Sequence, residues 1–249
     1  MNKKPIITLK NCDLSFKLQF RRETLEVIRS VSLETYEGEF LVMVGPSGSG
    51  KSTLLRIMSG LETGFTGEVT LASGITKKDM SFVFQQYALY PWLSVFDNIA
   101  LGLIARNEPE QTVRHKVIEA ATDLGLEKFI DSFPRELSGG MKQRVGIARA
   151  LVTEPKIIFM DEPFSGLDSF TVTELRRDLL RIWKEKQMTI VLVTHLAAEA
   201  VELADRVVVV TPRPCQIHSI IENTLKRPRK NRTKPFYELE DTIVSLVRT

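Results

Sequence analysis

The stretch of the chain best suited to chemistry is the glycine-rich loop of residues 45–53, GPSGSGKST. It fits the pattern G-x-x-x-x-G-K-[ST], follows the apolar run EFLVMV and leads into TLLRIMSG, which is typical of a helix. Gly48 and Gly50 let the backbone curl so that its N–H groups point inward at phosphate oxygens, and the helix N-terminus adds partial positive charge. The alternative is a glycine-rich turn without a ligand. A strand, a loop with its lysine and a helix follow one another in the order that the motif requires, which favours a phosphate-binding loop.

The side chains of this loop can share the binding of a polyphosphate. Lys51 is expected to reach the β- and γ-phosphates, and the Ser52 hydroxyl can bind Mg²⁺. The other residues assigned to the phosphate-binding loop are Gly45, Pro46, Ser47, Gly48, Ser49, Gly50 and Thr53.

A phosphate-binding loop needs an acidic partner for its Mg²⁺, and the run IIFMDE at residues 157–162 supplies one. Four apolar residues predict a buried strand, and Asp161 and Glu162 stand at its end. Asp161 is placed to bind Mg²⁺ directly or through water. Glu162 is a candidate general base that would orient the attacking water. A simple turn signal is the alternative for this acidic pair.

A second glycine-rich stretch, LSGGMKQRVGIARA at residues 137–150, resembles a phosphate cradle but lacks the lysine. Ser138 stands where a helix N-cap would be, and Gly139 and Gly140 could expose N–H groups to a phosphate. Taken alone, this pattern is a helix N-cap with flexible glycines.

The elements that must position these residues follow an α/β pattern. Nearly continuous apolar runs predict strands at IITLK, EFLVMVG, DMSFVFQ, KIIFMDE, TIVLVTH and DRVVVVT, as expected for a mostly parallel sheet buried on both faces. Helical patterns occupy KSTLLRIMSG, the region 110–130, MKQRVGIARALVT and FTVTELRRDLLRIWKEK. The stretch 86–150 shows no convincing strand and is predicted to be a helical insert.

Composition narrows the class of protein further. With 43% hydrophobic and 26% charged residues the chain can form a packed core, and a net charge of +3 gives no argument for nucleic-acid binding. Cys12 and Cys215 lack the spacing of a metal site or a disulfide framework, which fits a reducing compartment. The start, MNKKPIITLKNCDL, is not expected to be a signal peptide, and no apolar run approaches the ~20 residues of a membrane span.

Six motifs, taken in order, resemble those of the nucleotide-binding subunit of an ATP-binding-cassette (ABC) transporter. They are GPSGSGKST (45–53), FVFQQ with Gln85, LSGGMKQR (137–144), IIFMDE (157–162), SGLD (165–168) and VTH with His195. The resemblance covers nearly the whole chain. It implies an ATPase that uses ATP and Mg²⁺.

The resemblance also implies why one chain carries two phosphate cradles. In such proteins two subunits pack head to tail, and Ser138, Gly139 and Gly140 of one subunit complete the ATP site of the other. Asp168 would contact the opposing subunit. Two half-sites on one chain therefore become two whole sites in a dimer.

Further roles follow by position in the motifs. Gln85 would ligate Mg²⁺ and report the nucleotide state, and His195 would bond the γ-phosphate or hold the attacking water. Phe16 resembles the aromatic residue that stacks on adenine, with Phe20 as a competitor and a core position as the alternative for either. The residue after the histidine is commonly Asp in relatives, whereas here it is Leu196.

The implied architecture is a single ABC nucleotide-binding domain over residues 1–249, with the P-loop NTPase fold and an antiparallel β edge. Its RecA-like core would span about 1–85 and 156–224, with a helical insert at about 86–150. A basic tail at about 225–249 holds a cluster of six Lys or Arg and is expected to be irregular. The tail could lie near anionic lipid or be a solvated charge run.

Finer features resemble the ATPases that serve import of nitrate, sulfonate, taurine and bicarbonate. They are YPWLSVFDNIALGL (90–103), MDEPFSGLDSFTV, ADRVVVVTPRP (204–214) and KNRTKPFYELE. The implied partners are a second ATPase subunit, a transmembrane permease and, indirectly, a solute-binding protein, at the cytoplasmic face of the membrane. An ABC ATPase acting on ribosomes or DNA and an exporter ATPase are the rivals.

The segment 86–100 is the expected docking groove for the permease's coupling helix. Its large apolar side chains would serve as anchors, or else pack inside the helical insert. They are Tyr87, Leu89, Tyr90, Trp92 and Leu93.

Overall fold

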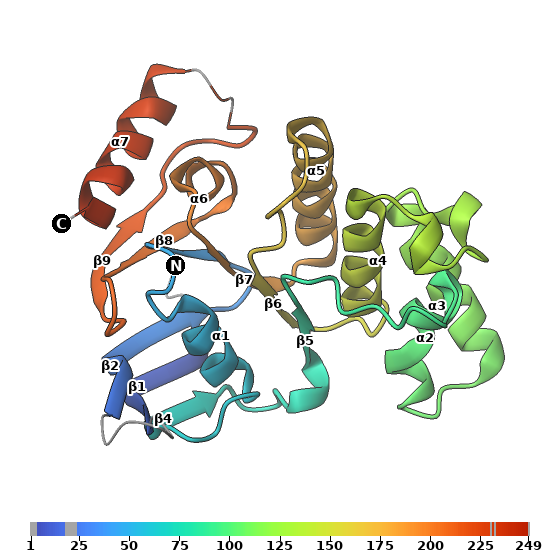
Figure 1. Ribbon diagram of the computed structural model, residues 1–249, viewed down its shortest axis with the longest axis horizontal. Helices are drawn as coiled ribbons and strands as arrows, with labels where there is room; N and C mark the ends of the chain where they lie inside the picture. Colours follow the sequence, from blue (N-terminus) through green and yellow to red (C-terminus); the bar gives the residue numbers. More distant parts are fainter. Residues whose placement is uncertain (1–3, 18–23, 230, 232, 249) are drawn as a thin grey trace. The chain divides into compact units, whose positions relative to one another are not determined.

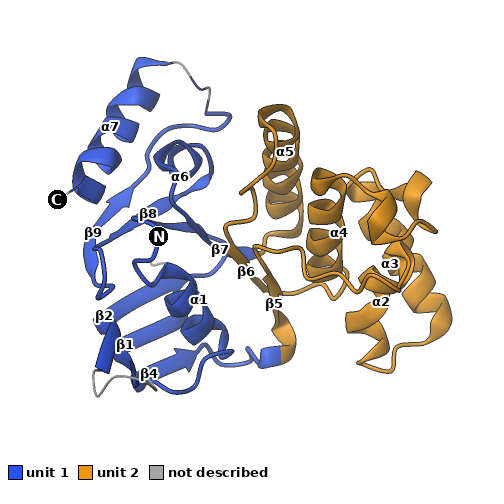
Figure 2. Ribbon diagram, in the orientation of Figure 1, with its two compact units in different colours: residues 1–77, 189–249 blue, residues 78–188 orange. Residues whose placement is uncertain are grey.

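The structure is a computed structural model that describes residues 4–17, 24–229, 231 and 233–248 (Figure 1). The chain forms two compact units, residues 1–77 with 189–249 and residues 78–188 (Figure 2).

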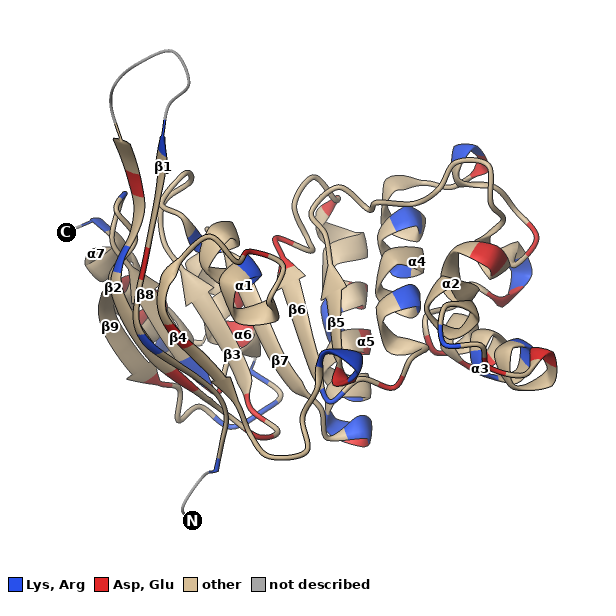
Figure 3. Cartoon of the chain, turned by 90° about the horizontal axis from the view of Figure 1, so that it is seen from below, with Lys and Arg blue, Asp and Glu red and all other residues tan. Residues whose placement is uncertain are grey.

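The first unit carries a group of buried parallel strands. Strand β3 (Phe40–Val44) pairs in parallel with β7 (Thr189–Thr194) on one side and β8 (Arg206–Val210) on the other. Every residue of these strands is buried, which is why they appear in the sequence as continuous apolar runs. In Figure 3, β3 and β7 carry no charged residue. Strand β9 (Ile217–Glu222) extends the group antiparallel to β8.

A separate three-stranded antiparallel sheet belongs to the same unit. Its order is β2 (Thr24–Tyr36), β1 (Pro5–Lys17), β4 (Thr66–Leu71). Strand β2 alternates buried and exposed residues towards its end, as a strand with one solvated face does. The expected antiparallel β edge is therefore present.

The helices of the first unit are α1 (Lys51–Ser59), α6 (Ala197–Leu203) and α7 (Lys234–Arg248). Helix α1 follows β3 directly after the glycine-rich loop. It ends at Gly60, whose left-handed φ of 72° allows its N–H to bond back to the helix.

The expectation of an irregular tail after residue 225 is wrong for residues 234–248, which form α7. Phe236 and Ile243 are buried two helical turns apart and dock the helix, and α7 packs against α6 and β8. Ahead of α7, Arg229 donates to the carbonyls of Val201, Glu202 and Ala204 at the end of α6. Part of the basic cluster thus anchors the chain instead of facing solvent.

The second unit combines two parallel strands with helices. Strand β5 (Met80–Val83) pairs with β6 (Ile157–Asp161), with Met80 opposite Ile157. Helices α2 (Val95–Ile104), α3 (Glu110–Asp123) and α4 (Gly139–Leu151) lie between them in the sequence, and α5 (Ser169–Lys186) follows. Short 3₁₀ turns span Lys77–Asp79, Glu127–Phe129 and Pro134–Glu136. This compact unit is wider than the predicted insert of 86–150, because it also holds β5, β6 and α5.

Candidate functional site

The phosphate-binding loop lies between β3 and α1 and needs glycine at several positions. Gly48 and Gly50 have left-handed φ angles of 72° and 110°. A Cβ atom on Gly45 would lie 2.6 Å from Cγ2 of Val210, and one on Gly50 would lie 3.0 Å from the Val27 carbonyl oxygen. Gly50 is also the N-cap of α1 and has no side chain to cap the helix. The helix N-terminus therefore offers its N–H groups to an anion, which fits a bound polyphosphate.

Lys51 is held inside this loop and is only 4% exposed. Its ammonium group donates to the carbonyls of Gly45 at 2.9 Å and Pro46 at 2.8 Å. The loop thus curves around a buried positive charge. Ser52 and Thr53 follow in the first turn of α1 and are half-buried.

The acidic pair lies at the end of β6 in the second unit. Asp161 is buried, and Glu162 has a left-handed φ of 43°, which is uncommon for a residue other than glycine. The Gln85 amide donates to the Glu162 carboxylate at 3.5 Å, a long hydrogen bond. Gln85 follows β5 and Glu162 follows β6, and the ends of parallel neighbours share one edge of a sheet. The fold therefore brings these two predicted site residues together.

The proposed Mg²⁺ ligands are few. Within the described residues no group of three or more His, Cys, Asp or Glu side chains could hold a metal by itself. Mg²⁺ commonly keeps several waters and takes one or two protein ligands beside phosphate oxygens. The side chains of Ser52, Gln85 and Asp161 each carry oxygen atoms, the ligand type that Mg²⁺ prefers.

The second glycine-rich stretch begins helix α4. Ser138 is the N-cap, as predicted, and its hydroxyl accepts from the Met141 N–H at 3.3 Å. A Cβ atom on Gly140 would lie 2.4 Å from Cγ2 of Thr171, and one on Gly139 would lie 3.1 Å from the Tyr87 hydroxyl. Both glycines therefore permit close packing, while Ser138 and Gly139 stay exposed at the helix N-terminus.

Asp168 caps α5 in the same unit. Its Oδ1 accepts from the N–H groups of Phe170 at 3.1 Å and Thr171 at 3.0 Å. The hydrogen bonds from Thr171 hold the pKa of the Asp168 carboxyl below its usual range. Phe170 beside it is 73% exposed, which is unusual for a phenylalanine.

His195 is exposed at the end of β7, immediately before α6. The next residue, Leu196, is the N-cap of α6 and cannot cap it with its side chain. The hydroxyl of Thr194 accepts the Leu196 N–H at 3.1 Å and donates to Glu199 at 2.6 Å. Thr194 therefore supplies a polar contact at the start of α6, where Leu196 has none to offer.

Phe16 lies near the end of β1, opposite Leu25 of β2, and is 42% exposed. This exposure excludes the core alternative for Phe16 and leaves its ring accessible to a base. The competitor Phe20 lies outside the described residues.

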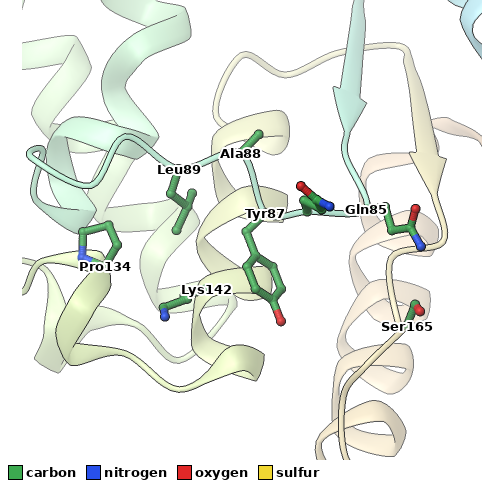
Figure 4. Close-up of a pocket in the computed structure, with 8 residues that line it drawn as sticks. Gln85, Tyr87, Ala88, Leu89, Pro134, Lys142 and Ser165 are labelled. Carbon is green, nitrogen blue, oxygen red and sulfur yellow. The ribbon is translucent and has the colours of Figure 1, made fainter.

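A pocket of about 530 Å³ adjoins the segment after β5 (Figure 4). Figure 4 shows Leu89 pointing towards Lys142 of α4, whereas the Tyr87 ring points to the other side. The pocket is lined by Gln85, Gln86, Tyr87, Ala88, Leu89, Pro134, Lys142 and Ser165.

The predicted docking residues of this segment differ in their exposure. Tyr90 and Trp92 are exposed, Trp92 by 69%, and Tyr87, Leu89 and Leu93 are partly exposed. Internal packing is therefore excluded for Tyr90 and Trp92, whereas Tyr87, Leu89 and Leu93 are partly packed within the unit. Asn98 fixes the turn beneath them, since its buried amide bonds to the backbone of residues 90, 93 and 94.

Comparison with known proteins decides the family. Residues 28–165 match the ABC transporter family. This chain belongs to that family. The prediction of an ABC ATPase with a P-loop α/β fold is thereby confirmed, and the chain is an ATP-binding cassette.

Relatives of this cassette match it over most of its length. It is 39% identical over 245 residues to the aliphatic sulfonates import ATP-binding protein SsuB of Bacillus subtilis, covering 96% of this chain and 93% of the relative. SsuB of Bacillus anthracis is 41% identical over 224 residues, with coverage of 89% and 88%. An uncharacterized ABC transporter ATP-binding protein of Methanocaldococcus jannaschii, MJ0412, is 41% identical over 245 residues, with coverage of 97% and 92%.

Two solved cassettes share the fold. One is a dimeric post-hydrolysis state of the ATP-binding cassette MJ0796 bound to ADP and Pi, with a TM-score of 0.78, 32% identity and coverage of 88% of this chain and all of that one. The other is CbiO1 of Clostridium perfringens, part of the ABC transporter complex CbiONQ, with a TM-score of 0.74, 26% identity and 89% coverage of both. In the described part of the present cassette, no helix is long and apolar enough to cross a membrane.

Sequence reasoning missed two arginines that hold the ATP-binding cassette's loops. Arg149 of α4 donates to the carbonyls of Tyr87 and Ala88, and Arg213 donates to the carbonyl of Gly48. The sequence did point to Arg213, because this residue lies in the TPRP motif of residues 211–214. The motif alone does not show that Arg213 contacts the phosphate-binding loop.

Proposed function

We propose that this cassette is the ATP-hydrolysing subunit of a membrane importer for a small anion or organic solute, with aliphatic sulfonates as the first candidate. The observation that carries the proposal is the likeness to SsuB proteins along nearly the whole of both chains. The exposed aromatic residues beside the 530 Å³ pocket support it, because an ATPase that drives a separate permease needs a docking surface.

In the proposed reaction, the phosphate-binding loop and Lys51 hold the β- and γ-phosphates of ATP. Ser52, Gln85 and Asp161 would hold Mg²⁺, which neutralises phosphate charge when bound. Glu162 orients the attacking water as general base, and the 3.5 Å contact from Gln85 positions its carboxylate. His195 bonds the γ-phosphate or the water, and Phe16 stacks on adenine.

A second copy of the chain completes each site in this proposal. Ser138, Gly139 and Gly140 begin α4 with exposed N–H groups suited to a γ-phosphate, and Asp168 would contact the partner subunit. The dimeric form of the related cassette MJ0796 supports this arrangement. Closure of the pair around ATP would move the permease, and hydrolysis would reopen it.

The permease's coupling helix would dock on the pocket and on Tyr90 and Trp92, as an apolar helix docks in a groove. The cassette would then lie at the cytoplasmic face of the membrane without spanning it. The solute-binding protein would meet the permease and not this chain, and no nucleic acid takes part.

The test is uptake of a radiolabelled alkanesulfonate by native cells that lack this chain. Deletion is expected to abolish uptake, and re-expression of the wild-type chain to restore it. Re-expressed Glu162→Gln serves as the matched control and should fail to restore uptake. Undiminished sulfonate uptake in the deletion strain would exclude this solute class, and nitrate, taurine and bicarbonate would be tested in the same strain.

A further inference from the structure

The loop between β8 and β9 contacts the phosphate-binding loop through an arginine. The Arg213 guanidinium donates to the Gly48 carbonyl through Nε at 3.2 Å and Nη2 at 3.0 Å. We propose that Arg213 is a positioning residue that holds the phosphate-binding loop in the shape that receives ATP. The inference rests on the ATP site of the proposed function and assigns it a residue outside the six motifs.

Hydrogen bonds within the loop that carries Arg213 hold its shape. The Thr211 N–H donates to the Gln216 carbonyl at 3.0 Å, and the Thr211 hydroxyl donates to the Pro214 carbonyl at 2.9 Å. Pro212 and Pro214 flank Arg213 and restrict the backbone on both sides of it. These constraints make the loop a rigid support for an exposed side chain.

The same loop is tied to the edge of the antiparallel sheet. The Cys215 N–H donates to the Val27 carbonyl at 2.7 Å, and its carbonyl accepts from the Arg29 N–H at 3.0 Å. A Cβ atom on Gly50 would lie 3.1 Å from Cys215 Cβ. The residues 210–216 therefore approach the phosphate-binding loop at Gly45, Gly48 and Gly50, and Arg213 makes the charged contact among them.

The contact with Gly48 fixes the peptide that matters for phosphate binding. In a trans peptide the C=O and N–H point in opposite directions, so fixing the Gly48 carbonyl sets the direction of the Ser49 N–H. In this structure the Ser49 N–H donates to the Pro46 carbonyl at 3.3 Å, a bond that it would exchange for a phosphate oxygen when ATP binds. Gly48 has a left-handed φ of 72°. A glycine can adopt many other backbone conformations of similar energy, and these compete with the left-handed one. A charged donor on its carbonyl selects one of them before the nucleotide arrives.

Two other carbonyls of the loop, those of Gly45 and Pro46, accept hydrogen bonds from the Lys51 ammonium group. In the proposed reaction Lys51 turns to the phosphates of ATP and gives up these bonds. Arg213 does not bind the phosphates in this proposal, so its hydrogen bonds to the Gly48 carbonyl remain while ATP is bound. Buried Cys215 does not weaken the local positive charge, because burial raises its pKa to about 12 and keeps the thiol neutral.

The test measures nucleotide affinity of the full chain by calorimetry, with ATP and with ADP, in the presence of EDTA. Arg213→Ala is expected to weaken both about tenfold, since charge-assisted hydrogen bonds to the loop are lost. Arg213→Lys restores one donor and should recover part of the affinity. Arg114→Ala is the control, because Arg114 is an exposed arginine of α3 whose side chain makes no hydrogen bond or ion pair with the residues that the structure describes.

Steady-state kinetics separate a positioning role from a merely structural one. Arg213→Ala should raise KM for ATP and leave kcat within about twofold, because the loop reforms once ATP is bound. If Arg213→Ala folds poorly, Arg213→Gln, which keeps most of the side chain, is expected to show the same KM increase. Affinity equal to that of Arg114→Ala, or a fall in kcat with unchanged KM, would overturn the proposal.

Lys51→Ala separates this proposal from the assignment of the site itself. It should lose nucleotide affinity more severely than Arg213→Ala. If Lys51→Ala binds ATP as the wild type does, the phosphate-binding loop is wrongly assigned. If Lys51→Ala loses ATP and Arg213→Ala does not, only the role of Arg213 is wrong.

Discussion

At the scale of single residues, Glu162 combines an acidic side chain with a strained backbone. It follows buried Asp161 with a φ of 43° and accepts a hydrogen bond from Gln85. Non-glycine residues in this region of φ cost of order 1 kcal/mol or more and tend to lie at functional sites. The strain therefore supports Glu162, the second residue of the acidic pair, as the general base.

Glu162→Gln is expected to keep ATP affinity and lower turnover about 10²- to 10³-fold, because the amide cannot act as a general base. Phosphate release measures turnover, and sedimentation in Mg-ATP should show the variant as a dimer that the wild type forms only briefly. ATPase activity like that of the wild type would exclude Glu162 as the base.

The two cysteines are predicted to be unreactive in the folded protein. Cys12 and Cys215 are fully buried, and burial raises the pKa of both thiols, that of Cys215 to about 12. The thiols keep their protons more tightly in the folded protein than in the unfolded chain, where the ordinary pKa is about 9. This difference adds to the free energy of unfolding below pH ~9, and the contribution is lost as the pH rises towards 12. A thiol reagent at pH 8 should label neither cysteine without urea and both in urea. Rapid labelling of the native chain would contradict this burial.

At the scale of elements, helix α4 does more than present the second glycine-rich stretch. Arg149 on α4 donates to the carbonyls of Tyr87 at 3.1 Å and Ala88 at 2.6 Å, and both acceptors have positive φ. Burial lowers the pKa of the Arg149 guanidinium below its usual range, although it stays charged near neutral pH. One helix thus holds the segment that follows Gln85.

Arg149→Ala is expected to destabilise the protein by about 1–3 kcal/mol, because the partly buried Tyr87 carbonyl and the exposed Ala88 carbonyl lose a charged donor. It should also lower ATPase activity, since the segment after Gln85 loses its support. Urea unfolding gives the free energy, with Arg114→Ala as the control for removing an exposed arginine. A change in the free energy of unfolding no larger than that of Arg114→Ala would show that the two hydrogen bonds contribute nothing.

Four of the six strands predicted from the sequence share one property. Strands β3, β6, β7 and β8 are buried on both faces and therefore stand out as apolar runs. Strands β2, β4 and β9 alternate or are largely exposed, and they carry no such signal. Helix α7 was missed because the prolines and charges ahead of it hide the buried pair Phe236 and Ile243.

At the scale of the whole molecule, the family could be predicted because its motifs stand next to strand ends and helix starts, where local sequence sets the geometry. The phosphate-binding loop and the N-cap at Ser138 are of this kind. Arg213 and Gly48 are 165 positions apart, and Arg149 and Ala88 are 61 apart. No local pattern encodes such pairs, so they required the folded chain.

The central claim is that this ATP-binding cassette works on a membrane permease, and a tagged pull-down tests it most directly. The chain would be purified from detergent-extracted membranes of its native cell, with Tyr90→Ala/Trp92→Ala as the matched variant. We expect a multi-span permease to co-purify in stoichiometric amount with the wild type, and less with the variant, because two exposed aromatic anchors are lost. Recovery of only soluble partners, such as ribosomes or DNA-repair proteins, would contradict the claim.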